Sequence, residues 1–139
     1  MIFHQQPWAD EIVGATRASI EAYLRHFLRH WSHDTDVFPD DEIAEFVEAY
    51  AQPGAVRGGF NCYRAVFRTA GQPQPDPAVR QPALILWADS DPILRFEWTD
   101  TLGQFFPNHT LKKIEGAGHF LHREAPERIN REIIEFLTK

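Results

Sequence analysis

His119 is the residue of this sequence that is best placed to move protons. It follows the turn Gly116-Ala117-Gly118, and a helix-forming stretch opens shortly after it at Pro126. The ordinary pKa of histidine lies near neutrality, so a histidine on a loop at the end of a strand can both take up and release a proton there. A carboxylate that accepts from the ring would fix its tautomer and stabilise its charged form. The sequence therefore has to supply an acidic partner.

Two aspartates qualify as that partner, and both lie in the stretch "ADSDPIL". This stretch follows a short apolar run, Ala83 to Trp87, which predicts a strand buried on both faces. His119 in turn follows a second predicted strand, Thr110 to Ile114. If the two strands are parallel neighbours, both loops lie at the same rim of the sheet. Asp91 then meets His119, although Asp91 could be a turn residue before Pro92 and Asp89 competes for the role.

The second half of the chain alternates strand and helix, as the tail of a parallel α/β sheet does. A helix is predicted between the strands, from about Glu97 to Phe106. The closing helix is predicted from Glu127 to Leu137, with an inward face made by Ile129, Ile133 and Leu137.

The first half of the chain is predicted to be helical. Apolar residues recur at three- and four-residue spacing in three segments, which predicts three amphipathic helices. Their apolar faces hold Ile20, Leu24, Phe27, Leu28 and Trp31; then Ile43, Phe46, Val47 and Tyr50; then Val56, Phe60, Tyr63 and Phe67. A proline-rich stretch over residues 73–82 follows, and we interpret it as a connector because no regular helix tolerates that density of proline.

The composition disfavours several classes of protein. A net charge of −6 argues against nucleic acid and anionic membranes as partners. No apolar run approaches the length of a membrane span, and the first residues lack the features of a signal peptide. The single cysteine, Cys62, cannot form an internal disulfide, so we expect a reducing compartment, the cytoplasm.

Other histidines have plainer interpretations. His26, His30 and His33 share one helical face, but no carboxylate is spaced with them as a fourth ligand, so a solvated polar face is favoured over a metal site. His122 is interpreted as a structural neighbour of His119. We expect no metal and no organic cofactor.

Several stretches of the sequence resemble a known family. "ALILWADSDPIL" and "GAGHFLHREAPERINREIIEFL" look like the last two strand–loop–helix units of the α/β-hydrolase fold. The chain order of acid and then histidine is that of α/β-hydrolases. "IFHQQPWADEIVGA", "EAYLRHFL" and "QPGAVRGGFNCYRA" resemble the helical cap of the epoxide hydrolase and haloacetate dehalogenase branch. The resemblance covers nearly the whole chain.

The resemblance implies roles for three residues. His119 is the general base that activates water, and Asp91, at the family's usual distance from its strand, orients it. Tyr63 in the cap donates a hydrogen bond to an epoxide oxygen or helps to hold a departing halide, although its place on an apolar helix face also fits plain core packing. The branch uses an aspartate nucleophile, which forms an ester that the activated water hydrolyses. The substrate would be a small epoxide, haloacid or ester.

The sequence departs from the family where the nucleophile should be. No serine (Ser19, Ser32, Ser90) and no aspartate lies in a glycine-framed turn between a strand and a helix. The oxyanion-hole segment and the first strands of the sheet are also absent from these 139 residues. We therefore expect a partial α/β-hydrolase fold. Residues 1–72 would form the cap, 73–82 the connector, and 83–139 the C-terminal part of the core.

This gap leaves three functions open. The chain is a hydrolase of the epoxide hydrolase or haloacetate dehalogenase type whose nucleophile lies elsewhere, or a serine-dependent carboxylic-ester hydrolase, or a truncated, non-catalytic paralogue that acts as a binding module. Two strands alone leave open sheet edges, so we expect either a homo-oligomer or association with the absent half.

Overall fold

The computed structural model of the chain describes residues 3–69, 71 and 78–138. These residues form two compact units. The first unit consists of Met1–Phe27 and Phe38–Pro73, and the second consists of Leu28–Val37 and Gln74–Lys139. The chain therefore enters the second unit briefly, through Leu28–Val37, before it returns to the first.

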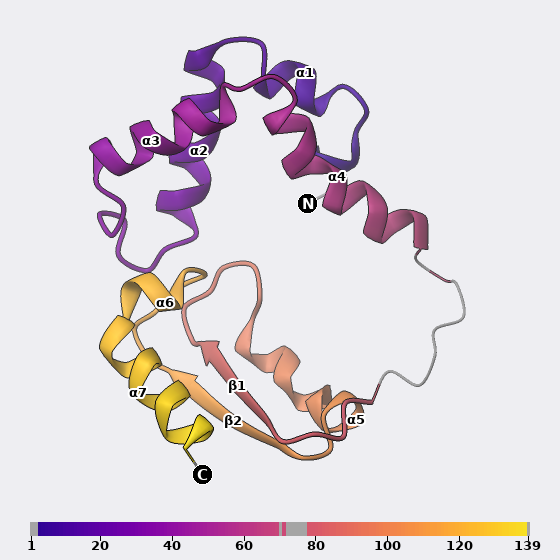
Figure 1. Cartoon of the computed structure of the whole chain (residues 1–139), viewed down its shortest axis with the longest axis vertical. Coiled ribbons are helices and arrows are strands. Elements are labelled where there is room, and N and C mark those ends of the chain that lie inside the picture. The colour runs from indigo at the N-terminus through magenta and orange to yellow at the C-terminus, as the bar shows by residue number, and fades with distance from the viewer. Residues whose placement is uncertain (1–2, 70, 72–77, 139) are drawn as a thin grey trace. The chain divides into compact units, whose positions relative to one another are not determined.

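The first unit is helical (Figure 1). It contains η1 (Phe3–Gln5), α1 (Ala9–Val13), most of α2 (Arg17–His30), α3 (Asp40–Tyr50) and α4 (Ala55–Thr69). The three predicted helices are confirmed as α2, α3 and α4, although Trp31 lies just beyond the end of α2 and the side chain of Phe67 lies outside the described residues. The short helices η1 and α1 were not predicted, because segments of three and five residues are too short for an apolar period to appear.

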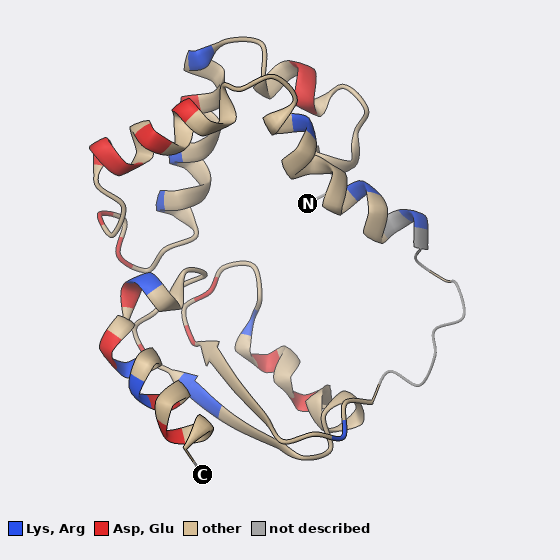
Figure 2. Ribbon diagram, viewed as in Figure 1, with Lys and Arg blue, Asp and Glu red and all other residues tan. Residues whose placement is uncertain are grey.

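Local chemistry explains where these helices begin. Pro39 occupies the N-cap position of α3, and Asp40, Asp41 and Glu42 in the first turn suit the positive end of the helix dipole. This acidic helix is visible in Figure 2. Gly54, just before α4, has a φ of 80°, a conformation that other residues rarely adopt. One apolar face of each helix is buried in the core of the unit, through Ile20, Leu24, Ile43, Val47, Val56 and Phe60.

The second unit holds a two-stranded parallel sheet. Strand β1 (Ala83–Ala88) pairs with β2 (His109–Ile114), with Ala83 opposite His109 and Ala88 opposite Ile114. The predicted strands are thus confirmed to within one residue. The helix predicted between them is instead the 3-10 helix η2 (Phe96–Thr101) followed by a single turn, α5 (Leu102–Phe105). The chain closes with α6 (Leu121–Glu124) and α7 (Pro126–Leu137).

The core of the second unit is small. Ala88, Ile114, Ala117 and Ile129 are its buried residues, with Leu86, Leu121 and Ala125 packed around them. In Figure 1, α7 runs along one side of the strands and the η2–α5 segment along the other. Among the connector residues, 73–77 lie outside the described part of the chain, and 78–82 form no helix or strand.

Two burial predictions for this unit are wrong. β1 was predicted to be buried on both faces, but Ala83 to Trp87 are only partly buried. On α7, Ile129 is buried as predicted, whereas Ile133 is 40% exposed and Leu137 is 74% exposed. The physical reason is the width of the sheet: in the described part of the chain β1 pairs only with β2, and two strands cannot cover a three-turn helix.

Candidate active site

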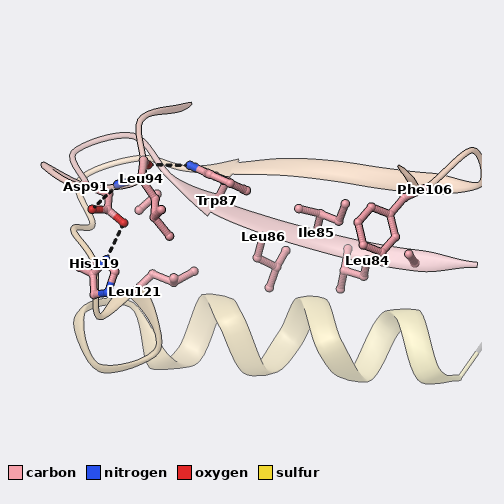
Figure 3. Close-up of a pocket in the computed structure, with 11 residues that line it drawn as sticks. Leu84, Ile85, Leu86, Trp87, Asp91, Leu94, Phe106, His119 and Leu121 are labelled. Carbon is pink, nitrogen blue, oxygen red and sulfur yellow. Dashed lines mark hydrogen bonds and ion pairs between the residues drawn. The ribbon is translucent and has the colours of Figure 1, made fainter. Parts of the chain in front are cut away.

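The loops after the two strands bring Asp91 and His119 together. Nδ1 of His119 lies 2.9 Å from Oδ2 of Asp91 (Figure 3). The side chain of Asp91 is 6% exposed and that of His119 is 24% exposed. The prediction that these two residues meet within hydrogen-bond reach at one rim of a parallel sheet is therefore confirmed.

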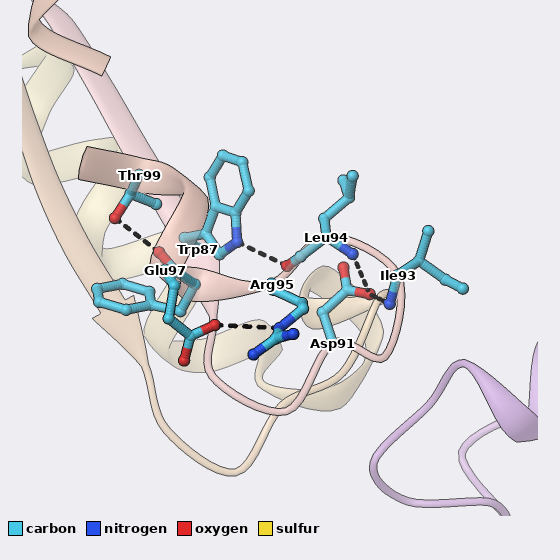
Figure 4. Close-up of polar contacts among 8 residues, drawn as sticks. Trp87, Asp91, Ile93, Leu94, Arg95, Glu97 and Thr99 are labelled. Atoms are coloured by element: carbon cyan, nitrogen blue, oxygen red, sulfur yellow. Dashed lines mark hydrogen bonds and ion pairs between the residues drawn. The ribbon is translucent and has the colours of Figure 1, made fainter. Parts of the chain in front are cut away.

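The surroundings of Asp91 fix the direction of this hydrogen bond. Its other oxygen, Oδ1, accepts from the backbone N–H groups of Ile93 at 2.8 Å and Leu94 at 3.0 Å (Figure 4). The indole N–H of Trp87 donates to the Leu94 carbonyl at 2.8 Å and so ties this turn back to β1. An ionised carboxylate can only accept, so Nδ1 of His119 carries the proton of this hydrogen bond, and in the neutral ring Nε2 then has the lone pair. That is the state a general base needs.

Asp89, the competing acid, has other partners. Its Oδ1 accepts from the Ser90 hydroxyl at 2.9 Å and from the Gly116 N–H at 2.9 Å. Desolvation alone would raise the pKa of Asp89, but these hydrogen bonds, together with the positive charge of Lys113 and the hydrogen bond of the Asp89 backbone, hold the pKa below its usual value. Asp89 thus joins the two strand-end loops to each other, and Asp91 alone of the two contacts the histidine ring.

The 31–34 turn holds the backbone of the His119 loop. The His119 N–H donates to the Trp31 carbonyl at 2.7 Å, and the two rings meet edge to face with their centroids 4.8 Å apart. The carboxylate of Glu124 accepts from Gly118 in the same loop. Sequence reasoning assigned Trp31 to the helical core and did not single out Glu124. No local pattern could have found the contacts with the 31–34 turn, because they join residues about 90 positions apart, as in the pair Glu124 and His33.

An apolar groove of about 430 Å³ runs along β1 and ends at the acid–base pair. In Figure 3, Asp91, His119 and Leu121 lie near one end of it and Phe106 near the other. Its walls are the six residues of β1 together with Asp91, Leu94, Phe106, His119 and Leu121. The groove offers apolar contact next to a polar, proton-accepting group, which is a usual composition for a site that binds a small molecule.

Tyr63, the third predicted site residue, belongs to the first unit. Its ring stacks on His4 with the centroids 4.6 Å apart and an interplanar angle of 20°. His4 is 2% exposed, and its Nε2 lies 2.7 Å from the Tyr23 hydroxyl. Burial raises the pKa of Tyr63 above its usual value, so its hydroxyl keeps its proton at neutral pH. The structure thus brings Asp91 and His119 together within one unit and places Tyr63 in the other.

The three serines engage acceptors close by in the sequence. The hydroxyl of Ser19 donates to the Val13 carbonyl at 2.9 Å, that of Ser32 to the Leu28 carbonyl at 2.7 Å, and that of Ser90 to Asp89. A serine nucleophile would instead need a hydrogen bond to the base. Nothing in this geometry makes any of the three a nucleophile for His119.

The described residues show neither a metal-binding cluster nor a membrane-spanning helix. No three side chains among the described His, Cys, Asp and Glu residues gather in a way that could hold a metal ion. Over the same residues, no helix has both the length and the apolar character to cross a membrane.

Comparison with known proteins places this arrangement in context. Residues 3–132 match the model of a family described as the alpha/beta hydrolase family. The chain is 32% identical over 103 residues to epoxide hydrolase 1 of Caenorhabditis elegans, covering 73% of the chain and 25% of that protein. It is 27% identical over 146 residues to human epoxide hydrolase 4, covering 99% of the chain and 38% of that protein.

A solved structure agrees with these matches at the level of the fold. The epoxide hydrolase CorEH superposes with a TM-score of 0.79 over 99% of the chain and 48% of CorEH, at 21% identity. The chain therefore spans well under half the length of these two curated relatives and about half of the solved structure.

Proposed function

The chain belongs to the alpha/beta hydrolase family, and we propose that it is of the epoxide hydrolase branch and carries the acid–base half of a hydrolase active site. The hydrogen bond between Asp91 and His119 at the carboxyl ends of two parallel strands is the observation that carries this proposal. The reaction would be that of the epoxide hydrolase or haloacetate dehalogenase type. The nucleophile, an aspartate in that branch, would come from sequence outside these 139 residues.

In this mechanism His119 acts on water. The nucleophilic carboxylate first attacks a carbon of the substrate, opening an epoxide or displacing a halide, and an ester forms. Nε2 of His119 then takes a proton from a water molecule while the water oxygen attacks the ester carbonyl. Asp91 stabilises the imidazolium that results, because its carboxylate already accepts from Nδ1. Release of the product alcohol regenerates the carboxylate and the neutral histidine.

Tyr63 would serve as the electrophilic donor. A tyrosine hydroxyl that is protonated at neutral pH can donate to an oxyanion or halide as it develops, and burial of Tyr63 raises its pKa and so preserves that state. The helical region of residues 1–72 would then be the cap that carries this donor, residues 73–82 the connector, and residues 83–139 the part of the core that carries the base. The substrate would be a small epoxide, haloacid or ester, with no cofactor, in the cytoplasm.

The open flank of β1 supports a second part of the proposal. Ala83 to Trp87 are apolar yet only partly buried, and they line the groove that ends at the acid–base pair. Exposed apolar surface and an unpaired strand edge favour association. We infer that this flank is covered in the working protein, either by the remaining part of the hydrolase sheet or by a second copy of the chain.

A His119→Gln substitution in the protein at its native length tests the reaction. Under the aspartate mechanism the ester still forms but is not hydrolysed, so incubation with an epoxide or a haloacetate should give a stable mass increase on one aspartate peptide. A serine enzyme needs the base for its first step, so the same variant would form no adduct with an ester substrate while the parent turns over. His122→Gln, an exposed histidine in the same segment, is the matched control.

The length of the native polypeptide is measured by mass spectrometry of the intact protein from its source. An intact mass that corresponds to residues 1–139, together with no adduct and no turnover on any substrate class, would contradict the enzyme proposal. It would favour a non-catalytic paralogue that binds small molecules or proteins.

A further inference from the structure

Glu124, at the end of α6, gathers three backbone amides on one carboxylate. Oε1 accepts from the Gly118 N–H at 2.9 Å. Oε2 accepts from the N–H groups of His33 at 2.6 Å and Asp34 at 3.1 Å. Hydrogen bonds to an ionised acceptor are stronger than neutral ones, so this one side chain joins the loop of His119 firmly to the 31–34 turn.

Gly118 shows how closely these two segments approach each other. A Cβ at Gly118 would lie 2.5 Å from the His33 nitrogen and 2.6 Å from the Trp31 carbonyl oxygen. Both atoms belong to the backbone and cannot swing aside. The residue before His119 is therefore in van der Waals contact with the turn that Glu124 holds. At the same place the backbone N–H of His119 donates to the Trp31 carbonyl.

Two supports hold His119, one at its ring and one at its backbone. Asp91 holds Nδ1 and so sets the rotation and tautomer of the ring. The position of the backbone from which the ring projects is set by the 31–34 turn, whose Trp31 also contacts the ring edge. A base that must be held to within a fraction of an ångström needs both supports. Only the second depends on Glu124.

We propose that Glu124 is a positioning residue for His119, which acts by fastening the 116–119 loop to the 31–34 turn. The proposal rests on the proposed function for its consequence, since it concerns the base of that reaction. Glu124 does not touch the reacting atoms. When its carboxylate is lost, the loop should open locally, and the hydrogen bond between His119 and Asp91 should weaken as the backbone moves.

Hydrogen exchange and proton resonances test the fastening without any need for activity. In Glu124→Ala, the amides of His33, Asp34 and Gly118 should exchange at least about tenfold faster, because charge-assisted hydrogen bonds are lost. The downfield Nδ1–H resonance of His119 should broaden or disappear. Amides of β1 and β2 should keep their rates. Glu124→Gln keeps one acceptor oxygen, so it should change the exchange rates and the His119 resonance less. It replaces the alanine variant in this test if that variant does not fold.

Glu127→Gln is the matched control, because it makes the same charge change at an exposed position three residues away. It should leave both readouts as in the parent. Unchanged exchange at the three amides would overturn the proposal. So would faster exchange with an unaltered His119 resonance, since Glu124 would then stabilise the turn without positioning the base.

Activity of the native-length protein separates this inference from the proposed function. In Glu124→Ala the ester should form at the parental rate and hydrolyse roughly tenfold or more slowly, as expected when a base is displaced. If His119→Gln itself leaves ester hydrolysis unchanged, the proposed function fails, and the exchange and resonance data still decide whether Glu124 holds the loop.

Discussion

Nδ1 of His119 lies 2.9 Å from Oδ2 of Asp91, although the two residues are 28 positions apart in the sequence. The parallel register explains the contact. Ala88 and Ile114, the last residues of β1 and β2, are partners across the sheet, so the loops that follow them start side by side. The pair is then locked by the two amides that donate to Asp91 and by the turn that holds the His119 backbone.

Asp91→Asn should disable the base with little change of shape. An asparagine amide can present a donor to Nδ1, which favours the wrong tautomer of His119. In the native-length protein we expect hydrolysis of the ester to slow by roughly 10²–10⁴-fold, the usual contribution of general base catalysis. The matched variant is Asp89→Asn, which should lose loop hydrogen bonds but retain most of the rate. Equal losses in the two variants would argue against Asp91 as the specific partner.

Gly118→Ala should destabilise the second unit, because its Cβ would meet backbone atoms at 2.5 and 2.6 Å. We expect the free energy of unfolding to fall by about 3 kcal/mol, the upper range for an overpacked site. Gly58→Ala is the opposite case: it lies in α4 with no atom within 4 Å of a built Cβ, so it should add about 0.5–1 kcal/mol through helix propensity. Urea unfolding measures both. A Gly118→Ala protein as stable as the parent would contradict the close approach.

His4 should make the first unit less stable at acid pH. Burial lowers the pKa of His4 below 6.5, so the folded chain binds this proton less readily than the unfolded chain. The contribution of neutral His4 to the free energy of unfolding is complete above pH 6.5. It is lost as the pH falls towards the pKa of His4 in the folded chain, at up to about 1.4 kcal/mol per pH unit. Urea midpoints at pH 7.5 and 5.5 should therefore differ less in His4→Phe than in the parent. His122→Gln, an exposed control, should retain the parental difference.

The 139-residue chain by itself should not turn over epoxides, haloacetates or simple esters. Its serines are engaged locally, and its sequence offers no aspartate in a strand–helix turn framed by glycines. Product formation clearly above that of a His119→Ala preparation would reveal a nucleophile within the chain.

Association of the isolated chain should depend on the flank of β1. Light scattering over a dilution series should show species larger than a monomer, because the apolar groove and the exposed face of α7 lie open. Ile85→Lys, which puts a charge in the groove, should shift the distribution towards the monomer. Val66→Lys, at a 63% exposed position on α4, should not. A concentration-independent monomer in the parent would refute the expected association.

The sequence alone determined the elements and the rim at which they meet. Apolar period and proline placed α2, α3, α4, both strands and α7, because these signals act within a few residues of each other. The order of strands and loops then sufficed to bring Asp91 and His119 together. That order left Asp89 as a competitor, since both aspartates follow the same strand. The family's usual spacing favoured Asp91, and the hydrogen bonds of the structure show that Asp91 meets the ring while Asp89 binds Gly116.

Tertiary structure decided what depends on distant chain segments. Glu124 and the 31–34 turn meet across about 90 residues, and no local pattern records such a contact. Ile133 and Leu137 are exposed because distant chain segments that could cover them are missing from the described part of the chain. Their spacing marks an apolar face correctly, but burial requires a surface to pack against, and the number of strands within reach sets the extent of that surface.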